Sequence, residues 1–150
     1  MDDEVNGFHL DRRVGVDADG NLVFRASNYL GDLKMFALIP CSPRTSLPQL
    51  RLRFQLCHRG LQRCESLTLR KANKELLLMM EDAGQCLLEV QRVDEKLLIM
   101  AIIGAVRYLH GKQLAHGFIC PESIFIGSEG QPKLCFFRAF SSNNSSINDE

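Results

Sequence analysis

Two carboxylates near the N-terminus, Asp17 and Asp19, are spaced closely enough to share a cation, and they are the first candidates for chemistry. A calcium loop of the EF-hand type needs its glycine at the sixth position and a bidentate glutamate at the twelfth. In this chain Gly20 comes too early for that pattern, and no glutamate follows at the required distance. An Asp-Gly pair between two strand-like segments is typical of a hairpin turn. We therefore expect a structural turn at Asp19-Gly20 and no metal site.

The six cysteines are the other candidate metal ligands. They are Cys41, Cys57, Cys64, Cys86, Cys120 and Cys135. No two of them form a C-x-x-C pair, so the spacing of a zinc site is absent. Most lie in apolar stretches, where a free thiol behaves as a small hydrophobic group. No secretory signal is recognisable, and we therefore expect a reducing setting, the cytoplasm, with the nucleus as the alternative.

The charge balance excludes some classes of partner. Eighteen basic residues balance eighteen acidic ones, so long-range attraction to nucleic acid or to an anionic membrane is not expected. Low net charge instead favours self-association. The longest apolar run, residues 97–106, is too short to span a bilayer.

The pattern before residue 81 predicts an antiparallel sheet. Strands are expected at residues 12–16, 22–25, 35–39, 64–69 and 75–80, with turns at Asp19-Gly20 and Asn73-Lys74. Residues 41–48 are rich in turn formers and indicate a loop. Residues 49–57 fit a strand or a helix, because their apolar positions satisfy both periods. The acidic residues 1–7 are expected to fray.

Helices are expected in the second half of the chain. The pattern predicts a short helix at residues 86–92 and a longer one at residues 95–110, with Asp94 as its N-cap and Gly111 as its stop. Residues 124–126 and 133–136 should form a hairpin, and the polar tail 141–150 should be disordered. The order of elements indicates an α+β fold, with a mainly antiparallel sheet lobe followed by a helical lobe.

Residues 106–138, VRYLHGKQLAHGFICPESIFIGSEGQPKLCFFR, resemble the catalytic-loop region of protein kinases. In that family the segment runs Y-L-H, then H-R-D-L-K-P-E-N-I, a turn, and K-L-x-D-F-G. The positions kept here are Tyr108, Leu109, His110, His116, Pro121, Glu122, Ile124, Lys133 and Leu134. Residues 58–61 resemble the turn after the family's regulatory helix, and residues 75–88 resemble the strand and hinge between its two lobes. The resemblance implies a protein-kinase-like fold.

The resemblance also implies which residues would carry phosphoryl transfer, and each of them is replaced. Phe118 stands at the general-base position, Cys120 at the loop lysine and Ser123 at the metal-binding asparagine. Phe136-Phe137-Arg138 stands in place of D-F-G, so the main magnesium ligand is missing. We expect the aromatic residues to fill space as core, and His116 to be structural.

The positions implied for a nucleotide are degenerate as well. Residues 15–22 loosely fit the glycine-rich loop, with Asp17 at its middle glycine, and Ile39 stands at the lysine of the third strand. Lys34 would project to the opposite face, and residues 47–57 contain no glutamate for an ion pair. The vestigial cleft would be lined by Gly15, Gly20, Ala37, Met80, Glu81 and Gly84. No metal or other cofactor is expected, and ATP is not expected to bind.

We therefore expect a truncated pseudokinase, catalytically inactive, that acts by binding other proteins or by regulating a kinase. Its parts would be a small lobe at residues 8–80, a hinge at 81–85 and a partial large lobe at 86–140. The family's later helices are missing, so the apolar face of the 95–110 helix would meet a protein partner: a kinase or a second copy. The H-G-x-I-C pattern of residues 116–120 is similar to Janus-kinase pseudokinase domains.

Two alternatives remain open. An atypical serine/threonine or tyrosine kinase could use Arg138, Lys34 or Ser123 in compensating roles, and magnesium-dependent phosphate transfer would reveal it. A nucleotide-binding switch without turnover would instead be stabilised by ATP against heat.

Overall fold

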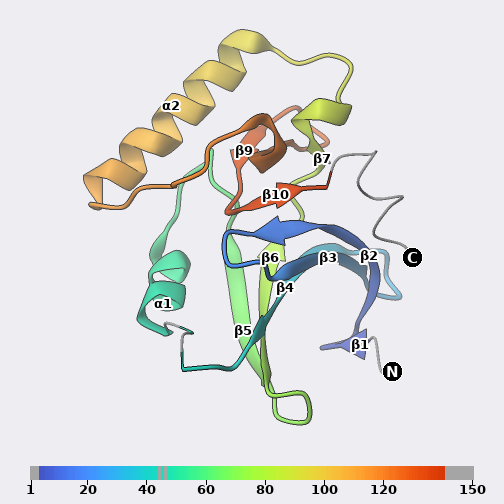
Figure 1. The fold of residues 1–150 in the computed structure, drawn as a ribbon. Coiled ribbons are helices and arrows are strands. Elements are labelled where there is room, and N and C mark those ends of the chain that lie inside the picture. Colours follow the sequence, from blue (N-terminus) through green and yellow to red (C-terminus); the bar gives the residue numbers. More distant parts are fainter. Residues whose placement is uncertain (1–3, 44, 46, 141–150) are drawn as a thin grey trace. The chain divides into compact units, whose positions relative to one another are not determined.

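The computed structural model describes residues 4–43, 45 and 47–140, and its chain divides into two compact units (Figure 1). The N-terminal unit comprises Met1–Leu56 and Arg63–Asp82, and the C-terminal unit comprises Cys57–Gln62 and Ala83–Glu150. The segment 57–62 was assigned to the first lobe from the sequence, but it belongs to the C-terminal unit. The predicted disorder of residues 141–150 lies outside the described residues.

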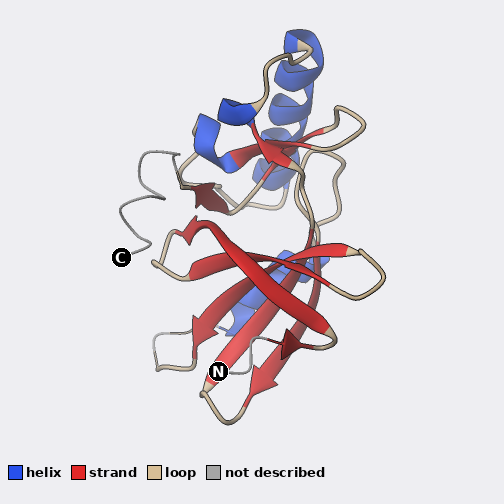
Figure 2. Ribbon diagram, turned by 90° about the vertical axis from the view of Figure 1, so that its right-hand side faces the viewer, coloured by secondary structure: helices blue, strands red, loops and turns tan. Residues whose placement is uncertain are grey.

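An antiparallel sheet makes up most of the N-terminal unit. Its strands are β1 (Glu4–Val5), β2 (Phe8–Asp17), β3 (Leu22–Ser27), β4 (Leu33–Pro40), β5 (Cys64–Arg70) and β6 (Glu75–Glu81). Their spatial order is β1-β2-β3-β4-β6-β5. The sheet is curled (Figure 2), and Val5, Ala26, Phe36 and Leu77 form a buried cluster on it. The predicted α+β class is thus confirmed, with antiparallel strands first.

Residues 4–7 differ from the prediction that the N-terminus frays, whereas residues 1–3 lie outside the described residues. Glu4 and Val5 pair with His9 and Phe8. Asn6 and Gly7 form the turn, with φ values of 53° and 81°. Positive φ at both central residues is what a type I′ hairpin turn requires, and Asn-Gly satisfies it with little strain. Residues 4–7 are therefore held in the sheet by this pairing, and Val5 is buried in the core.

The ambiguous stretch after β4 is helical. Helix α1 spans Leu47–Gln55, so it also takes in the last two residues of the predicted loop 41–48. Pro48 is tolerated because it lies in the first turn, where no intrahelical partner exists for an N–H group. Leu50 is the buried residue of the helix, and α1 packs against β5. Because one side of the segment is buried around Leu50, residues 47–55 form a helix and not the alternative strand.

The C-terminal unit combines one long helix with short strands. These elements are β7 (Gln85–Cys86), the 3₁₀ turn η1 (Leu87–Glu89), α2 (Glu95–Gly111), the 3₁₀ turn η2 (Pro121–Ser123), β8 (Ile124–Ile126), β9 (Pro132–Leu134) and β10 (Phe137–Ala139). The strand order is β7-β8-β9, and α2 packs against β9. No helix in the described part of the chain has the length and apolar character needed to cross a membrane.

The predicted helix at 86–92 is wrong. Gln85 and Cys86 pair with Ile126 and Phe125, which holds the backbone extended, and only a single 3₁₀ turn follows. The ladder with β8 satisfies backbone groups that a helix would have satisfied internally. Tertiary pairing therefore overrides a helical pattern that covers fewer than two turns.

Helix α2 begins as predicted and ends differently. The side chain of Asp94 accepts a hydrogen bond from the Leu97 N–H at 3.1 Å, so Asp94 is the N-cap. Gly111 lies inside the helix, and the reversal comes at Gln113, whose φ is 59°. The Leu114 N–H donates to the Leu109 carbonyl at 2.9 Å across that reversal. Gln113, not Gly111, therefore takes the left-handed conformation that ends the helix.

The segment 57–62 is held to the C-terminal unit by backbone hydrogen bonds. The Leu134 N–H donates to the Gly60 carbonyl at 2.7 Å, and the Gln62 N–H donates to the Leu134 carbonyl at 3.0 Å. The Cys57 N–H donates to the Tyr108 hydroxyl at 2.9 Å. A Cβ on Gly60 would lie 2.6 Å from the Ala101 carbonyl oxygen, so only glycine lets this segment lie so close to α2.

Candidate functional site

His116 lies at the centre of the loop that follows α2, and it is buried. Its Nε2 lies 2.6 Å from the carbonyl oxygen of Cys135, and the N–H of Phe118 donates to its Nδ1 at 3.4 Å. A carbonyl oxygen only accepts hydrogen bonds, so Nε2 carries the proton and Nδ1 accepts. These two bonds occupy both ring nitrogens with backbone groups, so the imidazole acts as a structural residue.

Two phenyl rings pack against this imidazole. The ring centroid of Phe118 lies 4.6 Å from that of His116, with the planes inclined by 52°. The ring of Phe136 stacks at 4.9 Å and 28°. Offset and tilted arrangements at such distances are favourable for aromatic pairs. Phe118 and Phe136, the positions at which the resemblance to kinases implied a general base and a metal ligand, therefore belong to one aromatic cluster, Phe118–His116–Phe136.

Ser123 stands where a metal-binding asparagine was implied, and it caps a turn. Its side chain is completely buried. The hydroxyl donates to the Cys120 carbonyl at 2.9 Å and accepts from the Cys120 N–H at 3.2 Å. The backbone carbonyl of Ser123 also accepts from the Cys135 N–H at 2.8 Å. These bonds tie η2 to the strand region that follows β9, so Ser123 acts as a structural residue.

The remaining predicted positions near this loop are Phe137 and Arg138, and Cys86 of β7 contacts η2 beside them. Phe137 is buried, and its ring lies 5.2 Å from that of Phe125. Arg138 is exposed. Cys86 donates weakly to the Pro121 carbonyl at 3.7 Å, and burial raises the pKa of its thiol above the usual value. A protonated, buried thiol is a poor nucleophile.

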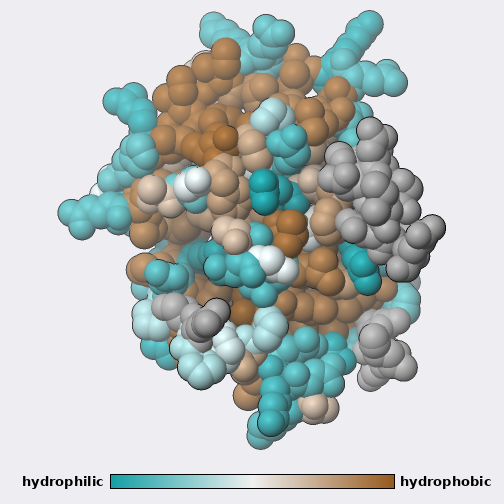
Figure 3. Space-filling view, viewed as in Figure 1, coloured by the Kyte–Doolittle hydropathy of each residue, from teal (hydrophilic) through white to brown (hydrophobic). Residues whose placement is uncertain are grey.

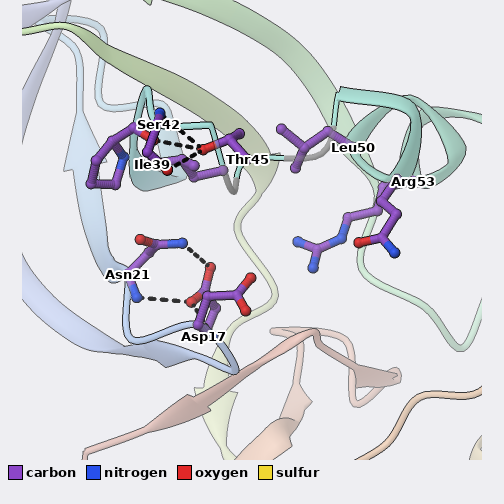
Figure 4. A pocket seen from close by; sticks show the side chains of 10 residues that line it. Asp17, Asn21, Ile39, Ser42, Thr45, Leu50 and Arg53 are labelled. Carbon is purple, nitrogen blue, oxygen red and sulfur yellow. Dashed lines mark hydrogen bonds between the residues drawn. The ribbon is translucent and has the colours of Figure 1, made fainter.

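The N-terminal unit contains a cavity of about 430 Å³ between the β2–β3 turn, the end of β4 and helix α1 (Figure 4). Its volume lies in the range of small-molecule pockets. The lining residues are Asp17, Asp19, Asn21, Ile39, Pro40, Ser42, Thr45, Gln49, Leu50 and Arg53. Ile39, the residue at the lysine position implied by the sequence, is among them.

Asp17 organises the turn at one side of this cavity. Its Oδ1 accepts from the N–H groups of Asp19 at 3.0 Å and Asn21 at 2.8 Å, and its Oδ2 accepts from the Asn21 side-chain amide at 3.0 Å. This is the hydrogen-bonding pattern of an aspartate turn, and it supports the interpretation of Asp17-Ala18-Asp19-Gly20 as structural. Among the residues that the structure describes, no group of three or more His, Cys, Asp or Glu side chains could hold a metal ion.

Arg53 of α1 lies at the other side of the cavity (Figure 4). The cavity therefore contains one guanidinium and the carboxylates of Asp17 and Asp19. A chain of phosphates entering it would meet two negative charges for each positive one, which is unfavourable in a partly desolvated space. The sequence revealed the missing glutamate in this region, but nothing in the periodicity indicated that Arg53 would line a cavity.

The other residues predicted for a nucleotide cleft are not brought to this cavity. Gly15, Gly20, Ala37, Met80 and Glu81 belong to the N-terminal unit, and none of them lines it. Lys34 instead lies 2.7 Å from the carboxylate of Glu65. Glu81 accepts a hydrogen bond from the Arg63 N–H through Oε1 at 2.9 Å.

Gly84, the last residue predicted for the cleft, lies in the C-terminal unit. Its φ is 98°, and a Cβ there would collide with the Ile126 carbonyl. Its identity is thus explained by the close approach of two backbone segments.

Comparison with known proteins does not assign this chain to a family. Neither the models of protein families nor the sequences of curated proteins match this chain. The functional argument therefore depends on the residues and contacts described above.

Proposed function

We propose that this chain is a non-catalytic, protein-kinase-like domain, a pseudokinase that works by binding other proteins. The observation that carries the proposal is the aromatic cluster Phe118–His116–Phe136, with ring centroids 4.6 Å and 4.9 Å from the imidazole. The resemblance to kinases assigns the general base to Phe118 and the main magnesium ligand to Phe136. A phenyl ring neither accepts a proton nor coordinates magnesium.

The size of the catalytic deficit supports this proposal. Removing one group that stabilises transition-state charge costs on the order of a hundred- to a thousandfold in rate. The chain lacks a carboxylate at both positions, and such losses are not additive but leave little rate to measure. Ser123 cannot compensate, because its hydroxyl is already bonded on both sides to Cys120.

A kinase-like domain without catalytic activity can still bind other proteins, and α2 has a surface suited to such binding. Its residues Leu97, Ile99, Met100 and Ile103 are exposed large hydrophobic side chains. Exposed apolar residues gathered on one element are typical of an interaction surface. All six cysteines are free thiols, which agrees with a proposed location in the cytoplasm.

A phosphoryl-transfer assay tests the proposal against the enzyme alternative. The purified chain is incubated with radiolabelled ATP and either magnesium or manganese, with a generic protein substrate and with an active kinase as the positive control. We expect no incorporation above the blank. Incorporation that disappears in Ser123→Ala or Arg138→Ala, while both variants stay folded, would establish an atypical kinase and overturn the proposal.

A thermal titration tests the nucleotide-switch alternative separately. A ligand that binds the folded state raises stability by RT ln(1 + [L]/Kd), which is about 2.7 kcal/mol at a hundredfold excess over Kd. We expect no shift in Tm with ATP, with or without magnesium. A shift that is lost in Arg53→Ala would place nucleotide in the α1 cavity and would support the switch without supporting turnover.

A further inference from the structure

Helix α2 carries a row of exposed residues spaced four apart: Glu95, Ile99, Ile103 and Arg107. Ile99 is 56% exposed and Ile103 is 52% exposed. Residues at i and i+4 are neighbours on a helix surface, so the four side chains form one continuous line, called here the 95–107 row. Met100, 62% exposed, lies three residues before Ile103 and therefore flanks the row.

The 95–107 row is separate from the side of α2 that stabilises the C-terminal unit. Ala105 and Leu109 are the buried residues of the helix, and the helix packs against β9. Figure 3 shows hydrophobic surface over the region of α2, with hydrophilic side chains at its margins. An amphipathic helix needs only one apolar side to hold its own unit, so the second apolar line requires another explanation.

The order of charges along the 95–107 row is self-complementary. When two copies of the helix meet antiparallel across a twofold axis, residue 95 of one faces residue 107 of the other, and residue 99 faces residue 103. Glu95 then meets Arg107 twice, and Ile99 meets Ile103 twice. A parallel arrangement would instead set glutamate against glutamate and arginine against arginine.

We propose that two copies of this chain associate through their 95–107 rows in this antiparallel arrangement. This dimer makes a second copy of the chain the partner in the proposed protein-binding function, and it therefore rests on that function. The net charge of zero removes the overall repulsion that would oppose association of two identical chains. A single helix face buries less than the roughly 800 Å² per partner of a standard interface. The dimer is therefore weak, with a Kd on the order of 10–500 µM.

Charge reversal tests this arrangement. The variant Glu95→Arg carries two arginines in the row, and Arg107→Glu carries two glutamates. Each alone sets like charges opposite one another in the dimer, so we expect its Kd to rise tenfold or more. An equimolar mixture pairs every arginine with a glutamate, and the mixture should form heterodimers with a Kd within about threefold of the wild-type value.

Sedimentation velocity over roughly 10 to 500 µM chain measures the result. Glu129→Arg reverses an exposed charge in the turn before β9 and serves as the control, with no change expected. Ile103→Asp should abolish the dimer, whereas Leu88→Asp, at an exposed aliphatic residue outside α2, should leave it intact. Circular dichroism of each variant confirms that α2 is retained.

The possible outcomes distinguish the antiparallel dimer from a monomer and from dimers formed through other surfaces. A monomer at all concentrations overturns the proposal. A dimer that survives both single reversals, or a mixture that fails to recover, also overturns it. Recovery in the mixture cannot come from helix stability, because both reversals place unfavourable charges at the ends of the helix dipole. The phosphoryl-transfer assay does not involve the 95–107 row, so failure of the dimer and failure of the proposed function are distinguishable.

Discussion

The imidazole of His116 stacks on the phenyl ring of Phe136, with centroids 4.9 Å apart and planes inclined by 28°. The two residues come from loops on either side of the β8–β9 hairpin. Their contact therefore closes the loop that follows α2 onto the segment that follows β9. Removing either ring should loosen the C-terminal unit.

Phe136→Ala should destabilise the protein by about 1–3 kcal/mol, because both ring stacking and partial burial are lost. Urea unfolding followed by circular dichroism measures the change. Phe136→Leu keeps much of the volume and should cost less than half as much. If both substitutions were neutral, the aromatic cluster would not be a stabilising contact.

His116→Ala should cost about 1–3 kcal/mol, because the buried Cys135 carbonyl loses the donor that lies 2.6 Å away. The same unfolding experiment measures it, with His9→Ala as the control because His9 is exposed. Equal effects of the two substitutions would show that the Nε2 bond contributes nothing specific.

Gly60→Ala should destabilise the C-terminal unit by about 1–3 kcal/mol, because its Cβ would lie 2.6 Å from the Ala101 carbonyl oxygen. Gly111→Ala is the matched control. Gly111 lies in α2, and a Cβ there would meet nothing within 4 Å. Alanine at that position should stabilise by about 0.5–1 kcal/mol through its helix propensity. Thermal denaturation of the two variants should therefore give shifts of opposite sign.

Burial raises the pKa of the Cys64 thiol to about 11 from a usual value of 9.0, with the charge of Arg53 opposing the shift. The folded state then holds its proton more tightly than the unfolded state. The corresponding stability is complete below pH 9 and is lost as the pH rises toward 11. By linkage the loss is on the order of 2–3 kcal/mol.

Unfolding of the wild type and of Cys64→Val between pH 8 and 11 isolates this contribution from the other groups that titrate there. We expect the variant to lose less stability over that interval. In the same protein, alkylation at pH 8 should modify the exposed Cys41 and Cys57 before Cys64. Parallel pH profiles of the wild type and the variant would contradict the raised pKa.

The sequence predicted well those elements whose signals are local. The Asp19-Gly20 hairpin needs only its turn residues and flanking apolar pattern, and α2 carries both an N-cap at Asp94 and four turns of helical period. Where the structure differs from the prediction, the local conformation is determined by a contact with residues that are distant in the sequence. Gln85 and Cys86 are extended because Phe125 and Ile126 lie beside them, and no feature within residues 86–92 shows this.

The candidate site was predictable in its residue types and less so in its geometry. Replacement of the catalytic carboxylates is visible at Phe118 and Phe136 directly. Their common contact with His116 depends on how the two loops meet, which spacing alone does not determine. The β1 strand was missed although Asn6-Gly7 is a hairpin signal, because two residues of strand are too short for a periodic pattern.

The segment 57–62 interrupts the N-terminal unit but belongs to the other. Its backbone partner Leu134 lies 72 residues beyond Gln62 (134 − 62). During synthesis on the ribosome, strands β1 to β6 therefore emerge well before the intervening segment has anything to dock on. The nascent sheet must tolerate an open loop between α1 and β5 until α2 has been made, and the bonds of this loop with Leu134 can form only after translation has passed residue 134.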